Sequence, residues 1–306
     1  MLRPILLKMS ESEKWKHRVS NWKITRSMVS RFISGNTLEE AIAVAKKLNS
    51  EGFLLTMDHL GEAILDPTEA DKAAEEYKLL LKAIKNDSIN STVSIKPTQL
   101  GLSVDQEQTR ERLLSVVRLS LELDGMVEID MENHPYTDIT LSIYKAAMAI
   151  NQKVRVCLQS YLYRTPEDLE ELIGLGGNIR LVKGAYKEPK ELAIPKKRDV
   201  DRVFIEQMKT GMSARAREKG FYTAIASHDE NAINVAIEYA KTHDVPLDSF
   251  EFQFLYGIKS NLAKDLVDRG YRVRLYLPYG SQWYPYFMRR LAERPANLMF
   301  MLRNTL

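Results

Sequence analysis

NIRLVKGAY, residues 178 to 186, is an apolar segment that carries two cations. Its apolar residues are typical of a buried strand, yet Arg180 and Lys183 lie in the same run. Because successive residues of a strand point to opposite faces, we expect these two side chains to face opposite ways. A charge in a core strand needs a partner, and an anionic or highly polar ligand would provide one.

Seven other segments of similar character occur along the chain, with helix-like stretches between them. Strands that alternate with helices predict parallel βα units, and eight such units in one domain predict a closed (βα)8 barrel of the TIM type. An open, doubly wound sheet is the alternative, which the lack of GxGxxG after the first strand disfavours. The expected strands lie within residues 53–60, 91–97, 126–132, 153–159, 178–186, 222–229, 250–257 and 272–280.

About fifty residues of a different kind precede the first expected strand. Two helices are predicted there, at residues 26–35 and 36–52, and Thr37 with Glu40 fits a capping box at the start of the second. We therefore expect residues 1–50 to form a helical extension that packs on the barrel. Residues 51–306 are expected to be the catalytic barrel.

Composition narrows the classes of function. The net charge of +3 on 306 residues, without a dense basic run, argues against a nucleic-acid partner. The single cysteine, Cys157, excludes an internal disulfide and suits a reducing cytosol. No apolar run is long enough to span a membrane, and the first residues do not resemble a signal peptide. A cytoplasmic protein is expected, with peripheral contact to the inner face of the cell membrane left open.

Polar residues follow almost every expected strand, while the strand starts are expected to be apolar. The carboxyl ends of the strands carry the chemistry of a (βα)8 barrel, so these residues are candidates for a site. Each also has a simpler interpretation: Asp229 can cap the next helix, Arg289 and Arg290 can form a solvated face, and Tyr286 can pack in the core. The polar residues at strand ends include Asp58, His59, Lys96, Asp130, Glu132, Gln159, Arg180, Lys183, Ser227, His228, Asp229 and Tyr276.

Lys96, Arg289 and Arg290 would bring three cations to one point. Arginine offers a planar fork that matches a carboxylate, and lysine adds a point charge. With tyrosines beside them, these cations predict a small carboxylate with an apolar body as ligand. The cations of residues 178–186 and His228 suit a second, larger ligand that carries phosphate, which would be a cofactor.

The sequence resembles the proline dehydrogenases, flavoenzymes that oxidise L-proline. RLVKGAY (180–186) and RRLAERPAN (289–297) are the most specific of the matching motifs. The chain resembles the short, monofunctional bacterial type, and the resemblance implies a distorted barrel with FAD at the strand ends. The other matching motifs lie at residues 31–37, 58–63, 94–101, 128–132, 161–169, 226–230, 250–258 and 274–280.

The resemblance also implies the reaction. L-Proline would lose a hydride from C5 to N5 of FAD and become 1-pyrroline-5-carboxylate, the first step of proline catabolism to glutamate. A membrane quinone would then accept the electrons. No metal is implied, and the oligomeric state is left open.

Site residues follow from the same resemblance. Asp130 and Arg180 would be catalytic, with Arg180 against the flavin near N5 and Asp130 orienting the cations. Glu293 would fix the rotamer of Arg289, and Glu62 would pair with Arg289 to close the site. The cofactor would contact Met131, Gln159, Arg180, Lys183, Gly184, Ala185, Ser227 and His228. The substrate would contact Lys96, Leu181, Tyr186, Tyr276, Tyr286, Arg289, Arg290, Glu293 and Glu62.

Two rival functions remain at this point. A class I aldolase would also place a lysine, Lys96 or Lys183, at a strand end to attack a carbonyl, and it would bind no flavin. A non-enzymatic barrel that binds an amino acid is the weaker rival. A flavin spectrum of the purified protein separates all three.

Overall fold

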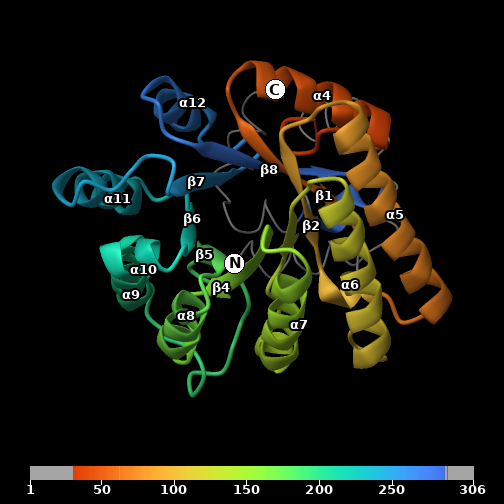
Figure 1. Cartoon of the computed structure of the whole chain (residues 1–306), viewed down its shortest axis with the longest axis horizontal. Helices are drawn as coiled ribbons and strands as arrows, with labels where there is room; N and C mark the ends of the chain where they lie inside the picture. The colour runs from red at the N-terminus through yellow and green to blue at the C-terminus, as the bar shows by residue number, and fades with distance from the viewer. Residues whose placement is uncertain (1–29, 62, 287, 289–306) are drawn as a thin grey trace, which may run out of the picture.

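The strands close into a single barrel in the computed structural model, which describes residues 30–61, 63–286 and 288. All neighbouring strands are parallel and follow chain order, and β1 pairs with both β2 and β8 (Figure 1). The predicted (βα)8 barrel is therefore confirmed, and the β1–β8 pairing excludes the open sheet. The strands are β1 (Leu54–His59), β2 (Ser91–Ile95), β3 (Val127–Ile129), β4 (Val154–Gln159), β5 (Asn178–Val182), β6 (Tyr222–Ala226), β7 (Phe250–Leu255) and β8 (Val273–Tyr279).

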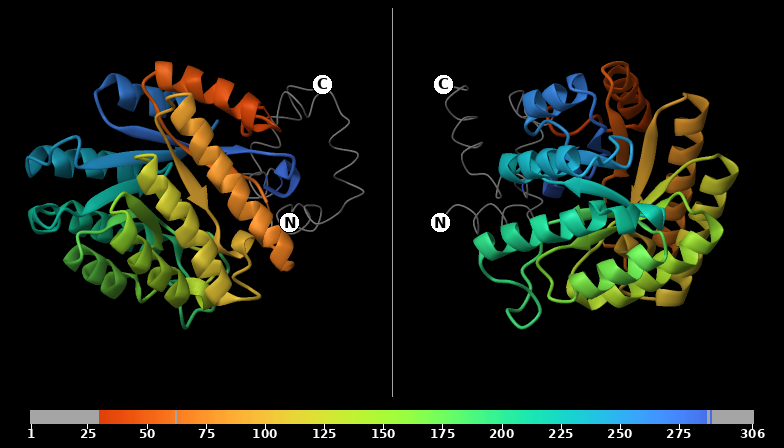
Figure 2. Two further views of the ribbon diagram at one scale, coloured as in Figure 1. Left: turned by 45° about the vertical axis from the view of Figure 1, so that its right-hand side comes forward. Right: turned by 60° about the vertical axis from the view of Figure 1, so that its left-hand side comes forward.

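Helices surround the barrel on its outside (Figure 2). Aspartates at three helix starts accept backbone N–H bonds that would otherwise lack a partner: Asp66 for α5, Asp105 for α6 and Asp229 for α11. The helices that lie wholly within the described residues are α4 (Leu38–Ser50), α5 (Pro67–Asn86), α6 (Gln106–Glu122), α7 (Thr137–Ile150), α8 (Thr165–Gly174), α9 (Lys197–Met212), α10 (Ala214–Glu218), α11 (Glu230–Thr242) and α12 (Ser260–Asp268), with 3-10 turns η1 (Pro97–Leu100) and η2 (His134–Tyr136).

The hydrophobic core lies between the strands and the helices. In β3, for example, Val127 and Ile129 belong to this core, whereas Glu128 between them bonds to side chains from other strands inside the barrel. Strand alternation therefore directs apolar residues outward and polar residues inward. The barrel interior is consequently a polar compartment.

Helix α4 packs beside β1 and β8. The hydroxyl of Thr37 accepts the N–H of Glu40 at 3.3 Å, as the capping box predicts. The Glu40 carboxylate accepts the N–H of Asn36 at 2.7 Å, one residue earlier than the motif requires.

The helix predicted for residues 26–35 is wrong over its described part, residues 30–35. Residues 30–32 form a turn, and no helix follows it before α4. The backbone N–H and the hydroxyl of Ser34 both donate to the carbonyl of Pro278, at 2.9 and 3.0 Å. The Gly35 carbonyl accepts the N–H of Gly280 at 2.9 Å. Bonds to the end of β8 replace helical bonds here, and the division at residue 50 stays a prediction.

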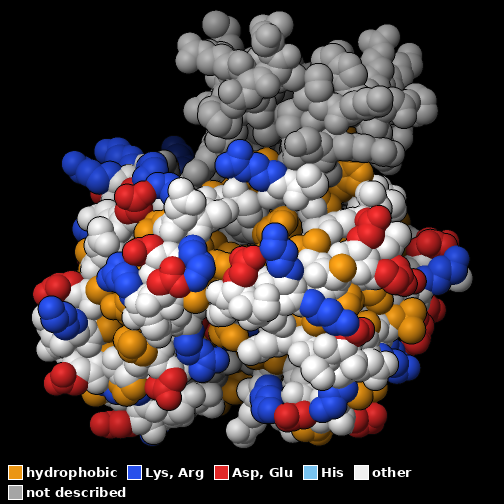
Figure 3. All heavy atoms as spheres, turned by 90° about the horizontal axis from the view of Figure 1, so that it is seen from above, with side chains coloured by type: hydrophobic (Ala, Val, Ile, Leu, Met, Phe, Trp, Pro, Cys, Tyr) orange, Lys and Arg blue, Asp and Glu red, His pale blue; other side chains and the backbone are white. Residues whose placement is uncertain are grey.

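One face of the molecule is mixed in charge. On the face seen in Figure 3, Lys and Arg side chains are interspersed with Asp and Glu side chains over the described residues. No helix in the described part of the chain has the length and apolarity needed to cross a bilayer.

Candidate active site

The second residues of β3, β4, β7 and β8 form an ion-pair cluster inside the barrel. We call these residues, Glu128, Arg155, Glu251 and Arg274, the lower cluster. Arg155 Nη1 lies 3.1 Å from Glu128 Oε1 and 2.6 Å from Glu251 Oε1, and Arg274 Nε lies 2.7 Å from Glu251 Oε1. The expectation of apolar strand starts is wrong for β3, β4, β7 and β8, because the second residue of each of these strands is charged and points into the barrel.

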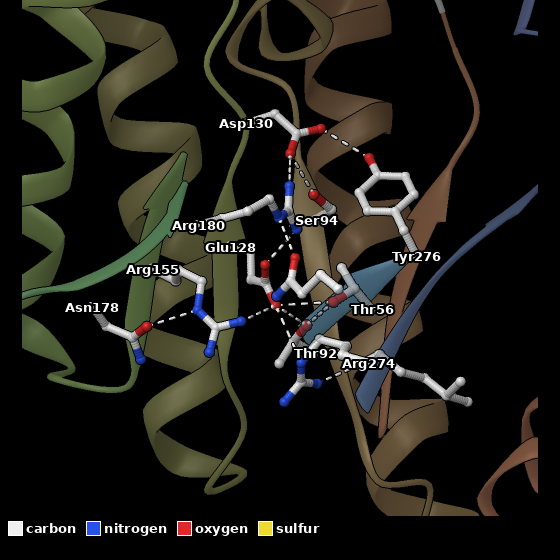
Figure 4. Close-up of polar contacts among 12 residues, drawn as sticks. Thr56, Thr92, Ser94, Glu128, Asp130, Arg155, Asn178, Arg180, Arg274 and Tyr276 are labelled. Atoms are coloured by element: carbon white, nitrogen blue, oxygen red, sulfur yellow. Dashed lines mark hydrogen bonds and ion pairs between the residues drawn. The ribbon is translucent and has the colours of Figure 1, made fainter. Parts of the chain in front are cut away.

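Glu128 is the most highly connected member of the lower cluster. Its Oε1 accepts the hydroxyls of Thr56 at 2.9 Å and Thr92 at 2.7 Å, and its Oε2 accepts Nη2 of Arg180 (Figure 4). Burial alone would raise the pKa of Glu128, but Arg155 and the other arginines hold it at about 2. Glu128 is therefore a fixed anion that joins the lower cluster to the strand ends.

A second group, the upper cluster, lies nearer the carboxyl ends of the strands and consists of Asp58, Lys96, Asp130 and Arg180. Arg180 donates from Nη1 to Asp130 Oδ1 and from Nε to Gln253 Oε1 at 2.8 Å. With the bond to Glu128, three of its five N–H bonds have acceptors among the described residues. Protein carboxylates thus supply partners for the charge of Arg180, and its contact with a ligand stays a prediction.

Tyr276 bridges the members of the upper cluster. Its hydroxyl donates to Asp130 Oδ2 at 2.8 Å (Figure 4). The same hydroxyl accepts from Lys96 Nζ at 3.1 Å. The guanidinium of Arg180 lies 5.1 Å from the ring centroid of Tyr276. Asp130 also accepts the hydroxyl of Ser94 at 2.8 Å. The structure therefore brings together four residues predicted for the site from the sequence: Lys96, Asp130, Arg180 and Tyr276.

Asp130 is an ionised carboxylate that is unsuited to act as a general base in this arrangement. Burial would raise its pKa, but Lys96 first and then Arg180 lower it to about 2. A general base needs a pKa near the working pH, so Asp130 is unsuited to that role. Its contacts fit the predicted role of orienting the cations.

Acid should weaken the fold through Asp130. A carboxyl group whose folded pKa is lowered stabilises the fold above its ordinary pKa, and this contribution disappears as the pH falls towards 2. From the lowering to about 2, we expect Asp130 to account for roughly 2 kcal/mol of the stability lost between pH 5 and pH 2. Urea unfolding at several pH values should show a smaller acid loss in Asp130→Asn than in the wild type. Equal losses in the two proteins would contradict the assignment.

Lys96 is held as a cation. Its Nζ lies 2.7 Å from Asp58 Oδ1 and 3.2 Å from Asp130 Oδ2. Burial would lower its pKa, but attraction to Asp58, Tyr276 and Asp130 raises it well above the ordinary value. An aldolase lysine must be a neutral amine to attack a carbonyl, so this environment disfavours the aldolase alternative at Lys96.

Lys183 follows β5 directly and lies on the side opposite to Arg180, as strand alternation predicts. Its Nζ lies 2.5 Å from Asp201 Oδ1 on α9 and 2.5 Å from Asp229 Oδ2 at the start of α11. Asp229 also caps α11, as its simpler interpretation proposed. Lys183 therefore has two protein anions as partners, like Arg180.

The loop after β5 is exposed at Gly184, Ala185 and Tyr186, and Tyr186 is 42% exposed. Gly184 has φ +121°, and a Cβ there would come within 2.3 Å of the Tyr161 ring. Glycine is needed here because Tyr161 lies against the backbone. The loop's predicted cofactor contacts stay predictions.

Gly184→Ala should lower the melting temperature more than Gly270→Ala. Both glycines have positive φ, but a Cβ at Gly270 would meet no atom within 4 Å. Thermal unfolding of the two variants compares backbone strain alone with strain plus a clash. The double variant Gly184→Ala/Tyr161→Leu should recover part of the loss, and no recovery would show that Tyr161 is not the obstacle.

Gln159, a predicted cofactor contact, is buried. Its Nε2 donates to the Glu132 carbonyl at 2.9 Å, and its Oε1 accepts the Ala185 N–H at 3.4 Å. Gln159 thus links the segment after β3 to the loop after β5. Glu132 accepts the N–H and hydroxyl of Thr98, at 2.9 and 2.6 Å.

Three further predicted cofactor contacts lie near strand ends. Met131 is buried just after β3. The Ser227 hydroxyl accepts the N–H of Asp229 at 3.2 Å, and His228 Nε2 accepts the N–H of Leu255 at 3.0 Å. Nε2 of His228 therefore carries no proton in this arrangement, so a proton on the ring is on Nδ1.

The predicted substrate contact at Leu181 is not supported by the structure. Leu181 is fully buried and belongs to the hydrophobic core, and alternation along β5 directs it to the helices because Arg180 points inward. A substrate contact at Leu181 does not fit this geometry.

The remaining predicted substrate contacts stay untested. Tyr286 is 8% exposed, and its predicted contact stays a prediction. Glu62, Arg289, Arg290 and Glu293 lie outside the described residues.

The sequence interpretation omitted four inward-facing charges from the predicted site: Glu128, Arg155, Glu251 and Arg274. The signal that identifies them is alternation within each strand, as in VEID (127–130), VRV (154–156), FEFQF (250–254) and VRLY (273–276). A charge at every second position of a core strand points to an ionic barrel interior.

The family model described as proline dehydrogenase matches residues 41–303. Proline dehydrogenase 1 of Bacillus subtilis (strain 168) is 39% identical over 306 residues, which is 100% of this chain and 99% of the relative. Proline dehydrogenase of Deinococcus radiodurans is 37% identical over 285 residues, which is 92% of this chain and 90% of the relative.

Among solved structures, proline utilization A (PutA) of Bdellovibrio bacteriovorus, inactivated by N-propargylglycine, is similar to this chain. The TM-score is 0.82 at 27% identity, over 88% of this chain. The chain corresponds to 33% of that longer protein, so this similarity concerns one part of it.

Proposed function

The chain belongs to the proline dehydrogenase family, and on that premise we propose that it oxidises L-proline to 1-pyrroline-5-carboxylate at the upper cluster. The match over nearly the full length of the chain is the observation that carries this proposal. The clustering of Lys96, Asp130, Arg180 and Tyr276 at the strand ends supports it. The reaction would be the first step of proline catabolism to glutamate.

We propose FAD as the cofactor. When bound, the flavin would supply the acceptor, at N5, for the hydride that leaves C5 of proline. The chain's residues fit such a group: Arg180 has two N–H bonds without acceptors among the described residues, and Gly184 and Ala185 are exposed residues. A buried cation at this point stabilises negative charge that develops beside it.

The remaining proposed cofactor contacts are Lys183, Met131, Gln159, Ser227 and His228. Lys183 would contact the cofactor while its ion pairs with Asp201 and Asp229 hold its side chain in position. The hydroxyl proton of Ser227 is available to donate, because its oxygen accepts from Asp229.

For the substrate, we propose that Lys96, Arg289 and Arg290 hold the proline carboxylate. Tyr276, Tyr286 and Tyr186 would lie around the ring. Glu293 would fix Arg289, and Glu62 would close the site over the bound substrate. Holding the ring in one orientation matters most, because hydride transfer requires C5 close to its acceptor.

Asp130 and Arg180 would serve the reaction by orientation and electrostatics. Asp130 contacts Lys96, Arg180 and Tyr276, so it fixes one residue proposed for the carboxylate, one for the cofactor and one for the ring. The amine proton would leave to solvent or another base, because a carboxyl group with a pKa of about 2 retains no proton near neutral pH.

We further propose a membrane quinone as electron acceptor and a cytoplasmic location with peripheral contact to the membrane. These proposals rest on the family resemblance alone.

The visible spectrum of the purified protein tests the cofactor. We expect a yellow protein that releases FAD on denaturation. A colourless protein that takes up no flavin when FAD is added would overturn the proposal, and release of FMN alone would contradict the assigned cofactor.

A further inference from the structure

The loop after β5, residues 183–196, carries three of the proposed cofactor contacts. Its two ends are tied to the backbone of Tyr161. The N–H of Tyr161 donates to the carbonyl of Lys183 at 3.0 Å, and the N–H of Ile194 donates to the carbonyl of Tyr161 at 2.8 Å. The residues between these two ties need further contacts to stay in one position.

Glu188, in the middle of this loop, binds His134 at the start of η2, in the segment after β3. Both carboxylate oxygens are used: Oε1 accepts the backbone N–H of His134 at 2.9 Å, and Oε2 lies 2.6 Å from His134 Nδ1. The side chain of Glu188 is 3% exposed, whereas that of His134 is 39% exposed. A carboxylate that is buried in this way needs its hydrogen bonds, so the contact differs from a solvated ion pair on the surface.

The sequence restricts both residues of this pair. His134 precedes Pro135, and Glu188 precedes Pro189. A proline limits the backbone conformations of the residue before it, so both sides of the contact are stiffened before they meet. Less conformational entropy is then lost when the contact forms.

The pair spans the end of β4, which lies between β3 and β5 in the barrel. Gln159, at the end of β4, joins the same two segments through the Glu132 carbonyl and the Ala185 N–H. The bond to Ala185 is long at 3.4 Å, so this connection holds the loop weakly. The two bonds between Glu188 and His134 are shorter, and they attach the loop more firmly to the segment after β3.

We propose that Glu188 and His134 form a latch that holds the loop of residues 183–196 in the position in which it binds FAD. The inference rests on the proposed function, because FAD is the cofactor proposed for this loop. It adds to that function two positioning residues, which act through the loop. A latch of this kind raises the fraction of molecules whose loop is ready to bind, and the affinity for FAD rises with that fraction.

The dissociation constant of FAD, measured from flavin fluorescence as the FAD-loaded protein is diluted, tests the latch. Glu188→Ala removes both bonds, and we expect it to weaken FAD binding at least roughly ten-fold. His134→Ala removes only the bond at Nδ1, and about a three- to ten-fold loss is expected. His134→Asn keeps a side-chain N–H donor close to the position of Nδ1, so its affinity should stay within about three-fold of wild type.

Limited digestion with trypsin gives a second readout that does not depend on flavin chemistry. The loop contains Lys187, Lys190 and Lys196, after which trypsin cleaves. A loop released from its latch is cut more readily, because proteolysis follows local opening. We expect the FAD-loaded Glu188→Ala protein to be cut after these lysines faster than the wild type, with the cleavage sites located by mass spectrometry.

Glu170→Ala is the matched control. It makes the same change at a carboxylate that binds Arg215 between α8 and α10, outside the loop, and it should leave both readouts at the wild-type level. The double variant Glu188→Ala/His134→Ala should bind FAD as Glu188→Ala does. Losses that add would show that the two residues act separately, which would overturn the inference.

A purely structural pair would lower the melting temperature and leave the FAD affinity and the cleavage rate unchanged, which would also overturn the latch. If Glu188→Ala does not fold, His134→Ala replaces it in both measurements, because the backbone bond to Glu188 remains in that variant.

The proposed function is tested separately in the same samples. If the wild type binds FAD and is reduced by L-proline, but the latch variants bind FAD as the wild type does, only the latch fails. If the wild type takes up no FAD, the proposed function fails, and the latch fails with it.

Discussion

Arg180→Met is expected to slow flavin reduction by L-proline by roughly 100- to 1000-fold, as loss of one preorganised donor does in other active sites. The variant should also lose about 3–5 kcal/mol of stability, because the buried carboxylates of Glu128 and Asp130 each lose one of their cationic partners. Flavin binding should weaken, since two N–H bonds of Arg180 are proposed to serve the cofactor. Rapid-mixing absorbance measures the reduction rate, and urea unfolding measures the stability.

Arg155→Met is the control that separates stability from chemistry. Arg155 also pairs with Glu128 and is 2% exposed, but it belongs to the lower cluster. We expect a similar loss of stability with flavin reduction within a few-fold of wild type. If both variants lose reduction to the same extent, the effect of Arg180 is a general consequence of a damaged barrel interior.

Lys96→Met is expected to lower kcat/KM for L-proline by about thirty- to several-thousand-fold, which corresponds to roughly 2–5 kcal/mol for a lost charged partner. The reason is twofold: the proline carboxylate loses a cation, and Asp58 loses its hydrogen-bond donor. Steady-state kinetics should show most of the effect in KM. Flavin content should stay near the wild-type level.

Lys183→Met should affect flavin content rather than KM, which is the opposite of the effect expected for Lys96→Met. Lys183 also has two carboxylate partners, but they belong to α9 and to the start of α11. Its loss should reduce flavin content while the protein that retains flavin keeps a near-normal KM. Loss of flavin from Lys96→Met with an unchanged KM would mean that the two lysines are wrongly assigned.

The fold could be predicted because its signals are local. Each strand carries its own apolar pattern, and each gap is long enough for a helix, so the eight units and their parallel pairing follow from the sequence. Residues 30–35 were wrongly predicted to be helical, because their conformation depends on hydrogen bonds to Pro278 and Gly280, which are far away in the sequence. The end of β3 was also hard to predict. The strand ends at Ile129, yet the backbone N–H of Asp130 still donates to the carbonyl of Ile95 in β2.

The site was predictable only in part. Strand ends identified Lys96, Asp130, Arg180 and Tyr276, because barrel geometry brings such positions together whatever the details of packing. The partners of those residues were not predictable in the same way. Which carboxylate meets Arg180 depends on register across the barrel, and Glu128 and Asp130 become its partners only once β3 and β5 face each other in three dimensions.

The substrate role expected for Leu181 came from the family resemblance and not from its position in the strand. Leu181 lies next to Arg180 in a specific motif, yet the one-residue step along β5 directs it to the helices. Alternation would have assigned it to the core from the sequence.

Anaerobic mixing of the FAD-loaded protein with L-proline tests the central claim most directly. We expect the visible absorbance of the oxidised flavin to bleach, and one equivalent of 1-pyrroline-5-carboxylate to form for each flavin reduced. A flavin that stays oxidised at saturating L-proline, in protein that unfolds cooperatively, would contradict the account.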